Sequence, residues 1–263
     1  MKRYWFAAPL LLPLIVILIW SIAIPTNVIE RLLEDNLSRS LNLRVRVEDL
    51  KKDILFGLEA DSLTLYRDDR TIIKIDDLKL RINPLTLITG TLDVYSIKGN
   101  LGSGKLKGNL SISSSSYKAH IEASNIDIAT IPYMSGFSLK GTDSFSGNLK
   151  IKDGKGEARF WSNNVVLDNA FIAGVALPLK AFNDIKGALD LSPGYVDVKS
   201  FSFEGSELSA RIKGTVKAGT MDMVMEVMPK ASYLNENSIF FSLLNQYKVS
   251  PGYYAIPIKG PLS

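Results

Sequence analysis

Apolar and polar residues alternate along most of this chain, beginning near residue 43, as in strands that have one dry and one wet face. In segment 43–50 the apolar positions are Leu43, Val45 and Val47, and arginines and a glutamate separate them. The same period of two recurs in segments 77–83, 117–123, 145–154 and 208–217, and turn residues stand at 68–69, 153–154, 193–194 and 218–219. This pattern predicts antiparallel strands that follow one another as a meander.

A period of 3.6 residues governs segment 27–41 instead. Its apolar residues fall on one helical stripe: Val28, Ile29, Leu32, Leu33, Leu37 and Leu41. The opposite face is acidic rather than rich in lysine, so we expect the stripe to pack on the following sheet and not on a membrane surface. Thr26 or Asn27 is the expected N-terminal cap of this helix. Two further short helical pieces are expected near 126–134 and 233–246.

The N-terminus carries an uncharged apolar run from Trp5 to Ile24, about the length that crosses a bilayer as a helix. Lys2 and Arg3 precede it and predict a cytoplasmic N-terminus. The predicted anchor residues are Trp5, Leu11, Ile15, Ile19 and Trp20, with the two indoles near the two membrane interfaces. A cleaved signal peptide is the alternative, because Ser21-Ile22-Ala23 resembles a cleavage site. Either way, residues 1–25 direct an exported domain, 26–263.

The predicted fold class is therefore mainly β, with an N-terminal transmembrane helix and a short amphipathic helix before a long, curved antiparallel sheet. The dry side of this sheet has two interpretations. It forms an open or partly closed trough, with a candidate apolar groove at Ile212, Val216, Met221, Met223 and Met225, because methionine suits variable apolar partners. Alternatively, the dry faces close on one another as an ordinary core. Periodicity alone leaves both interpretations open.

The composition of the chain limits the classes of function that it can have. The formal net charge is only +4, and the basic residues are scattered along the strands, which argues against a nucleic-acid partner. The chain has no cysteine, which excludes disulfides and thiolate metal sites. Its single histidine, His120, falls on the polar side of a predicted strand, and no serine lies in a G-x-S-x-G motif. The glycines of 99–109 do not have the spacing of a phosphate-binding loop.

The acidic pairs Asp68-Asp69 and Asp76-Asp77 lack the glycine and glutamate of a calcium-binding loop. We therefore expect no catalytic, cofactor or metal site and no enzymatic activity. An aromatic cluster near the C-terminus is a candidate docking patch, comprising Tyr247, Tyr253 and Tyr254. The alternative interpretation places these tyrosines in the core of the last strands.

Two segments of the chain resemble a known superfamily. The segment "IERLLEDNLSRSLNLRVRVEDLKKDILFGLEADSLTL" resembles the opening of AsmA-like envelope proteins, and "VDVKSFSFEGSELSARIKGTVKAG" is similar to their repeats. Within that superfamily the chain resembles the GspN family of type II secretion proteins in "IDDLKLRINPLTLITGTLDVYSIKG" and in the C-terminal "YYAIPIKGPLS". This likeness covers most of the chain and consists of repeat style and order.

The resemblance implies a single-pass inner-membrane protein whose bulk lies in the periplasm. It implies an accessory role in type II secretion, with other secretion subunits as docking partners and phospholipid as a further contact on the apolar sheet face. The alternative function is lipid binding or lipid transfer for outer-membrane biogenesis, as in larger AsmA-like relatives. A chain of this length could hardly bridge a periplasm alone, since each residue of a strand adds only about 3.3 Å.

Overall fold

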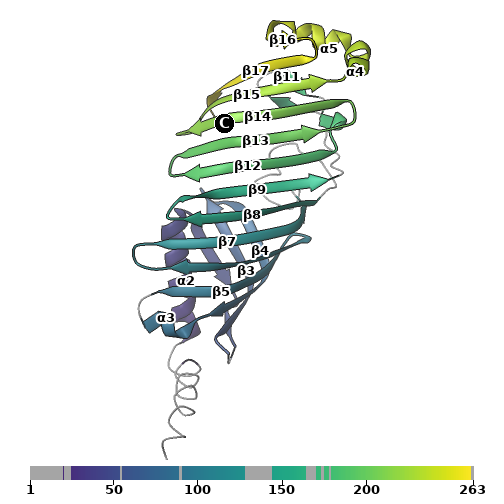
Figure 1. Cartoon of the computed structure of the whole chain (residues 1–263). Helices are drawn as coiled ribbons and strands as arrows, with labels where there is room; N and C mark the ends of the chain where they lie inside the picture. The colour runs from purple at the N-terminus through teal and green to yellow at the C-terminus, as the bar shows by residue number, and fades with distance from the viewer. Residues whose placement is uncertain are drawn as a thin grey trace, which may run out of the picture. The chain divides into compact units, whose positions relative to one another are not determined.

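The computed structural model describes residues 20, 25–53, 55–88, 91–127, 144–163, 170–172, 175–177 and 179–261. Four of the predicted anchor residues, Trp5, Leu11, Ile15 and Ile19, lie outside this part of the chain. Among the described residues, no helix has both the length and the apolar character needed to cross a membrane. The fold is mainly β, and its strands form a long, open antiparallel sheet (Figure 1).

The sheet has fifteen strands among the described residues, in the order β1-β3-β4-β5-β6-β7-β8-β9-β12-β13-β14-β15-β17-β16, with β2 beside β3. Its first strands are β1 (Arg44–Glu48), β2 (Lys51–Lys52), β3 (Gly57–Arg67), β4 (Arg70–Ile82), β5 (Leu92–Leu101), β6 (Gly104–Ile112) and β7 (Tyr117–Asp127). The remaining strands are β8 (Ser144–Lys152), β9 (Lys155–Asn163), β12 (Asp184–Ser192), β13 (Tyr195–Glu204), β14 (Leu208–Lys217), β15 (Thr220–Pro229), β16 (Lys248–Ser250) and β17 (Tyr253–Pro261). A separate pair joins β10 (Ala170–Ile172) to β11 (Val175–Leu177).

The predicted meander is confirmed, and all four predicted turns connect adjacent strands. The helix α2 (Thr26–Leu41) is also confirmed, but its cap differs from the prediction. Pro25, in an extended conformation, precedes the helix, and no side chain caps it. Short helices α4 (Ala231–Glu236), α5 (Ser238–Leu243) and η5 (Asn245–Tyr247) fill most of the second helical region. Of the helical piece expected near 126–134, the first two residues lie in β7 instead, and 128–134 lie outside the described residues.

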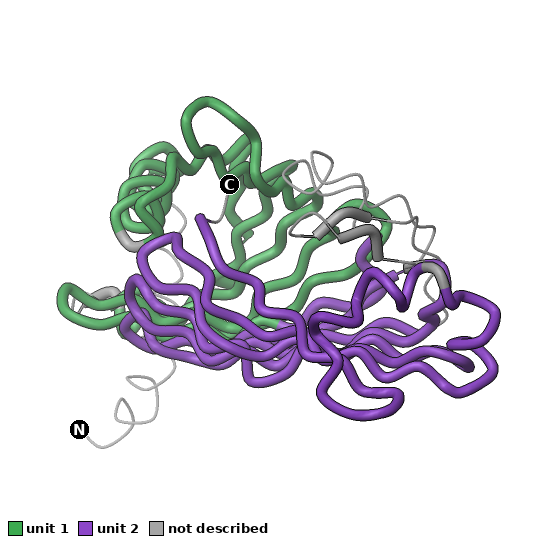
Figure 2. Tube along the Cα trace, turned by 90° about the horizontal axis from the view of Figure 1, so that it is seen from above, with its two compact units in different colours: residues 1–121, 131–133 green, residues 122–130, 134–263 purple. Residues whose placement is uncertain are grey.

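The chain divides into two compact units (Figure 2). Unit 1 comprises residues 1–121 and 131–133, and unit 2 comprises residues 122–130 and 134–263. In unit 1 the buried side of β3, β4 and β5 meets α2 through Ile29 and Leu33. Three other residues of the predicted stripe, Val28, Leu32 and Leu41, remain exposed, so the helix buries only part of its apolar face.

Side chains of α2 also hydrogen-bond to the outer edge of β1, the first strand of the sheet. The Val47 backbone N–H donates to Glu34 Oε1 at 2.8 Å, and the Val45 N–H donates to Ser38 Oγ at 3.0 Å. Glu34 and Ser38 stand four residues apart and therefore lie on one side of the helix. Two backbone donors that an edge strand would leave without a strand partner are thus bonded within the chain.

Trp20, predicted at a membrane interface, is buried in the core of unit 1 with 2% of its surface exposed. Its indole N–H donates to the Asp53 carbonyl at 2.9 Å, and Lys52 Nζ donates to the Trp20 carbonyl at 2.7 Å. The indole also contacts Phe56, with ring centroids 5.7 Å apart. Trp20 is therefore an integral part of the folded unit.

Candidate functional site

The apolar face of unit 2 is the candidate site, because its side chains are buried at one end of the strands and partly exposed at the other. The register of β9, β12, β13, β14, β15 and β17 aligns apolar side chains into rows that cross the sheet. We call two of these the closed row and the open row. On β14 they pass through Ala210 and Val216, about 20 Å apart at the usual rise of about 3.3 Å per residue.

Every member of the closed row is buried. It runs across six strands through Ser162, Ile185, Phe203, Ala210, Val227 and Tyr254. The short helices α4 and α5 cover the β17 side of the closed row (Figure 1). Phe241 of α5 lies 5.3 Å from Tyr254 between ring centroids, and Leu244 is buried beside it in the same cluster. Phe182 covers the other side of the row, 5.4 Å from Phe203.

Between the two rows, phenylalanine rings pack along the sheet surface. The Phe160 ring lies over Gly187, where a Cβ atom would come within 2.1 Å of the ring. Phe160 also meets Phe201 edge to face at 5.3 Å. A side chain at position 187 would have to displace this ring, so glycine lets the ring lie close to the backbone and extend the covered part of the face.

The open row crosses seven strands and contains no charged residue. It runs through Ile151, Gly156, Leu191, Val196, Val216, Met221 and Gly260. Each of these residues is partly exposed, so the row is accessible to solvent along its whole length. Seven strands about 4.8 Å apart give a strip of about 29 Å. An apolar strip of this length is more than scattered surface hydrophobics would produce.

The structure separates the five predicted groove residues by position. Ile212 and Met225 are buried beside the closed row, so they belong to the core. Val216 and Met221 lie in the open row, directly opposite each other on β14 and β15. Met223 stands between the two groups, and both Met221 and Met223 are partly buried against the core cluster. The core interpretation therefore holds for Ile212 and Met225, and the groove stays a prediction for the open row.

The three predicted docking tyrosines do not form one patch. Tyr254 is buried against Phe241 in the closed row, and Tyr247 packs at the margin of the same cluster. Tyr253 lies on the polar face, where its hydroxyl bonds to Glu226. These positions favour the core interpretation for Tyr247 and Tyr254.

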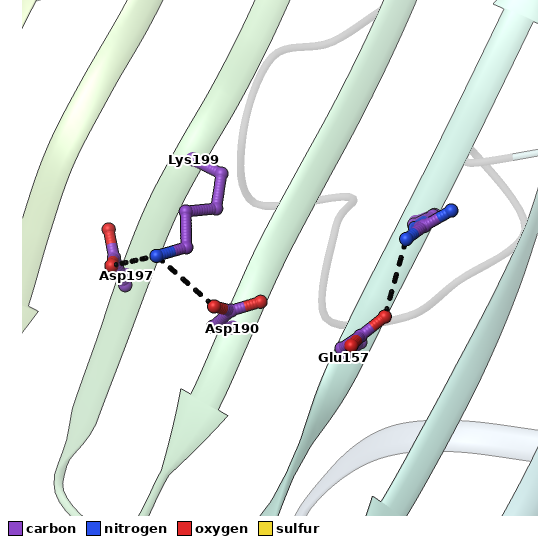
Figure 3. A network of polar contacts seen from close by, with 5 residues as sticks. Glu157, Asp190, Asp197 and Lys199 are labelled. Atoms are coloured by element: carbon purple, nitrogen blue, oxygen red, sulfur yellow. Dashed lines mark hydrogen bonds and ion pairs between the residues drawn. The ribbon is translucent and has the colours of Figure 1, made fainter.

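The opposite face of unit 2 is a network of ion pairs. Lys199 bridges two strands, with its Nζ 2.7 Å from Asp197 and 3.2 Å from Asp190, and Glu157 pairs with Arg159 nearby (Figure 3). The hydrogen bond with Asp197 raises the pKa of Lys199 above its ordinary value. Because these charged side chains are mostly exposed, this face is a solvated surface. Exposed ion pairs of this kind contribute little to the stability of the fold.

One ion pair of the polar face is more enclosed than the others. Lys213 Nζ lies 2.6 Å from Glu226 Oε1, and the Glu226 carboxylate is mostly covered. The hydrogen bond from Lys213 holds the pKa of Glu226 below its ordinary value, against the opposing effect of burial. The pair lies directly behind the buried end of the apolar face and helps to fix β14 against β15.

Three exposed lysines stand at hairpin ends next to residues of the open row. Lys152 and Lys155 face each other at the β8–β9 turn, and Lys217 follows Val216 at the end of β14. Because successive side chains of a strand point to opposite faces, these lysines belong to the polar face and not to the open row.

The described residues offer little for catalysis. Within them, no group of three or more histidine, aspartate or glutamate side chains is arranged to hold a metal ion. His120 lies in β7 and is partly exposed. The candidate site is the open row, an uncharged apolar strip on one face of unit 2. Comparison of the chain with protein-family models, curated proteins and solved structures found no match.

Proposed function

We propose that this chain is an inner-membrane-anchored, periplasmic protein that holds lipid acyl chains along the open row of unit 2. The partly exposed, uncharged strip across seven strands is the observation that carries this proposal. Residues 1–25 supply the anchor, and the sheet acts as an open trough on its apolar side. The AsmA-like resemblance supports the same function.

The dimensions and chemistry of the strip suit a phospholipid. Its length of about 29 Å exceeds one leaflet, which is half of a hydrocarbon core of about 30 Å. An extended acyl chain would cover apolar side chains that are otherwise partly exposed to water, at a gain of about 25 cal/mol per Å².

Photocrosslinking in the full chain tests this proposal. The photoreactive residue benzoylphenylalanine is placed at Val216, in the open row, and in a matched variant at Thr215, the adjacent residue on the opposite face. After irradiation in native membranes, we expect mass spectrometry to find phospholipid joined to the chain at position 216 and little at position 215. Equal yields at the two positions, or no lipid at either, would contradict the proposal.

A second candidate function is an accessory role in type II secretion, through docking at the C-terminal end of unit 2. Two large apolar side chains there are among the most exposed of the described residues, Leu243 of α5 at 71% and Val249 of β16 at 65%. Neither contributes to the closed row. Exposed apolar residues of this kind are typical anchors of protein interfaces, and the GspN resemblance supplies the class of partner.

A secretion assay tests this second function. We expect Leu243→Asp combined with Val249→Asp to reduce the amount of a type II substrate released to the medium, because the charges prevent apolar docking. Ser238→Asp, which adds the same charge at an exposed site of α5, is the control and should secrete normally. Normal secretion by the double variant, at an unchanged level of the protein, would exclude this docking site.

A further inference from the structure

We propose that the end of unit 1 around Trp20 lies on the membrane surface, with Leu55 and Leu85 inserted among the lipid headgroups. This inference rests on the anchoring part of the proposed function and adds a membrane-contact surface to it. It follows from three observations: the attachment of Trp20, the exposure of two leucines, and the position of the apolar run along the chain.

Trp20 lies near the end of the predicted membrane-spanning run, four residues before Ile24, and is bonded to one end of unit 1. Its indole N–H and its carbonyl are bonded to Asp53 and Lys52, which connect β2 to the turn before β3. Lys52 Nζ also lies 5.5 Å from the centre of the indole ring. Because Trp20 is bonded to this turn, a span that leaves the bilayer at Trp20 brings the turn to the interface.

Two exposed leucines stand at this same end of unit 1. Leu55 is 58% exposed and directly precedes Phe56, which contacts Trp20. The Phe56 carbonyl accepts a hydrogen bond from the Ile82 N–H at 3.0 Å, which brings the start of α3 (Pro84–Ile88) to the same end of the strands. Leu85 of α3 is 61% exposed.

The occupant that fits these leucines is the interfacial region of the bilayer. Exposure of the Leu55 and Leu85 side chains to water is unfavourable, and insertion into the bilayer interface would remove part of their apolar surface from water. The headgroup region is about 5–7 Å thick on each side, so side chains next to the end of the span reach it directly. Lys52 is suited to this level because lysine extends its amino group toward phosphate and water.

Site-specific labelling of the full chain tests this inference, since the chain has no native cysteine. Leu55→Cys and Leu85→Cys are each labelled with a nitrobenzoxadiazole fluorophore after reconstitution into phosphatidylethanolamine–phosphatidylglycerol vesicles that carry nitroxide-labelled lipid. Asp68→Cys is the matched control, at the exposed turn on the far end of β3, about 36 Å from Gly57 along the strand. We expect strong quenching at positions 55 and 85 and weak quenching at position 68.

Carbonate extraction of the same vesicles separates the possible failures. If the chain resists extraction but quenching at positions 55 and 85 is no stronger than at position 68, the surface contact is overturned. The proposed membrane anchor is then still supported. A chain that carbonate removes from the vesicles would overturn both. Strong quenching at 55 and 85 in an extraction-resistant chain supports both.

Discussion

Replacing Ile212 with glutamate is expected to destabilise unit 2 by about 5–7 kcal/mol at neutral pH. Ile212 is 6% exposed and lies between Phe201 on β13 and Met225 on β15. A carboxylate there must stay charged in an apolar interior or take up a proton. Keeping a glutamic acid protonated at pH 7, against its ordinary pKa of about 4.3, costs about 3.7 kcal/mol. The lost burial of isoleucine adds to this cost.

The same substitution at the open row is the matched control. Val216→Glu changes the same strand on the same face, but its carboxylate can reach water, so we expect a loss of about 1 kcal/mol. Hydrogen exchange in peptides of unit 2, measured as the full chain unfolds, gives the loss of stability in each variant. Equal losses of stability in the two variants would contradict the difference in burial between Ile212 and Val216.

The pH dependence gives the Ile212→Glu variant a distinct signature. Its carboxyl pKa is raised in the folded state, so the folded state binds more protons than the unfolded state at neutral pH. Its stability relative to the natural chain therefore falls as the pH rises above about 4.3 and recovers below that value. A loss of stability that does not change with pH would show that the introduced carboxylate is not buried.

Trp20→Ala is expected to destabilise unit 1 by about 3–5 kcal/mol, the usual cost of removing a large aromatic ring from a core. Trp20→Phe is the control, because it keeps an apolar ring and removes only the indole N–H that donates to Asp53. We expect that variant to lose about 1–2 kcal/mol. Hydrogen exchange in β3, β4 and β5 reports the effect, with the peptides of unit 2 as an internal reference.

Unchanged exchange in unit 1 after Trp20→Ala would mean that the indole is not part of its core. The expected result bears on the processing of the N-terminus, since cleavage after Ala23 would remove the same side chain. Soluble fragments of the exported domain should therefore retain Trp20 if unit 1 is to keep its native stability.

Alternation along the chain was enough to predict the strands. The pattern at 208–217 matches β14 residue for residue, and the turns at 193–194 and 218–219 lie where glycine follows the last strand residues. The helix from Thr26 to Leu41 was equally clear, but its cap was not. Pro25 precedes the helix as its cap residue, with a fixed φ that suits the start of a helix, whereas side-chain capping was the expectation.

The same pattern could not show which part of the dry face is covered. Ala210, Ile212 and Val216 alternate in the same way along one strand, yet only the first two are buried. Their burial depends on Phe182 and Phe241, which lie far away in the sequence and reach the sheet only after the chain has folded. Trp20 was misplaced for the same reason, because its bond with Asp53 spans thirty-three residues.

The bonds from Glu34 and Ser38 to β1 also limit how this protein can assemble. A neighbouring chain that tried to extend the ladder at β1 would first have to displace both side chains from Val45 and Val47. A filament of copies joined head to tail through their edge strands would need the β1 edge, because each junction would pair the β1 edge of one copy with the β16 edge of the next. The sealed edge therefore disfavours filaments, and the number of strands encoded in one chain sets the length of its apolar strip.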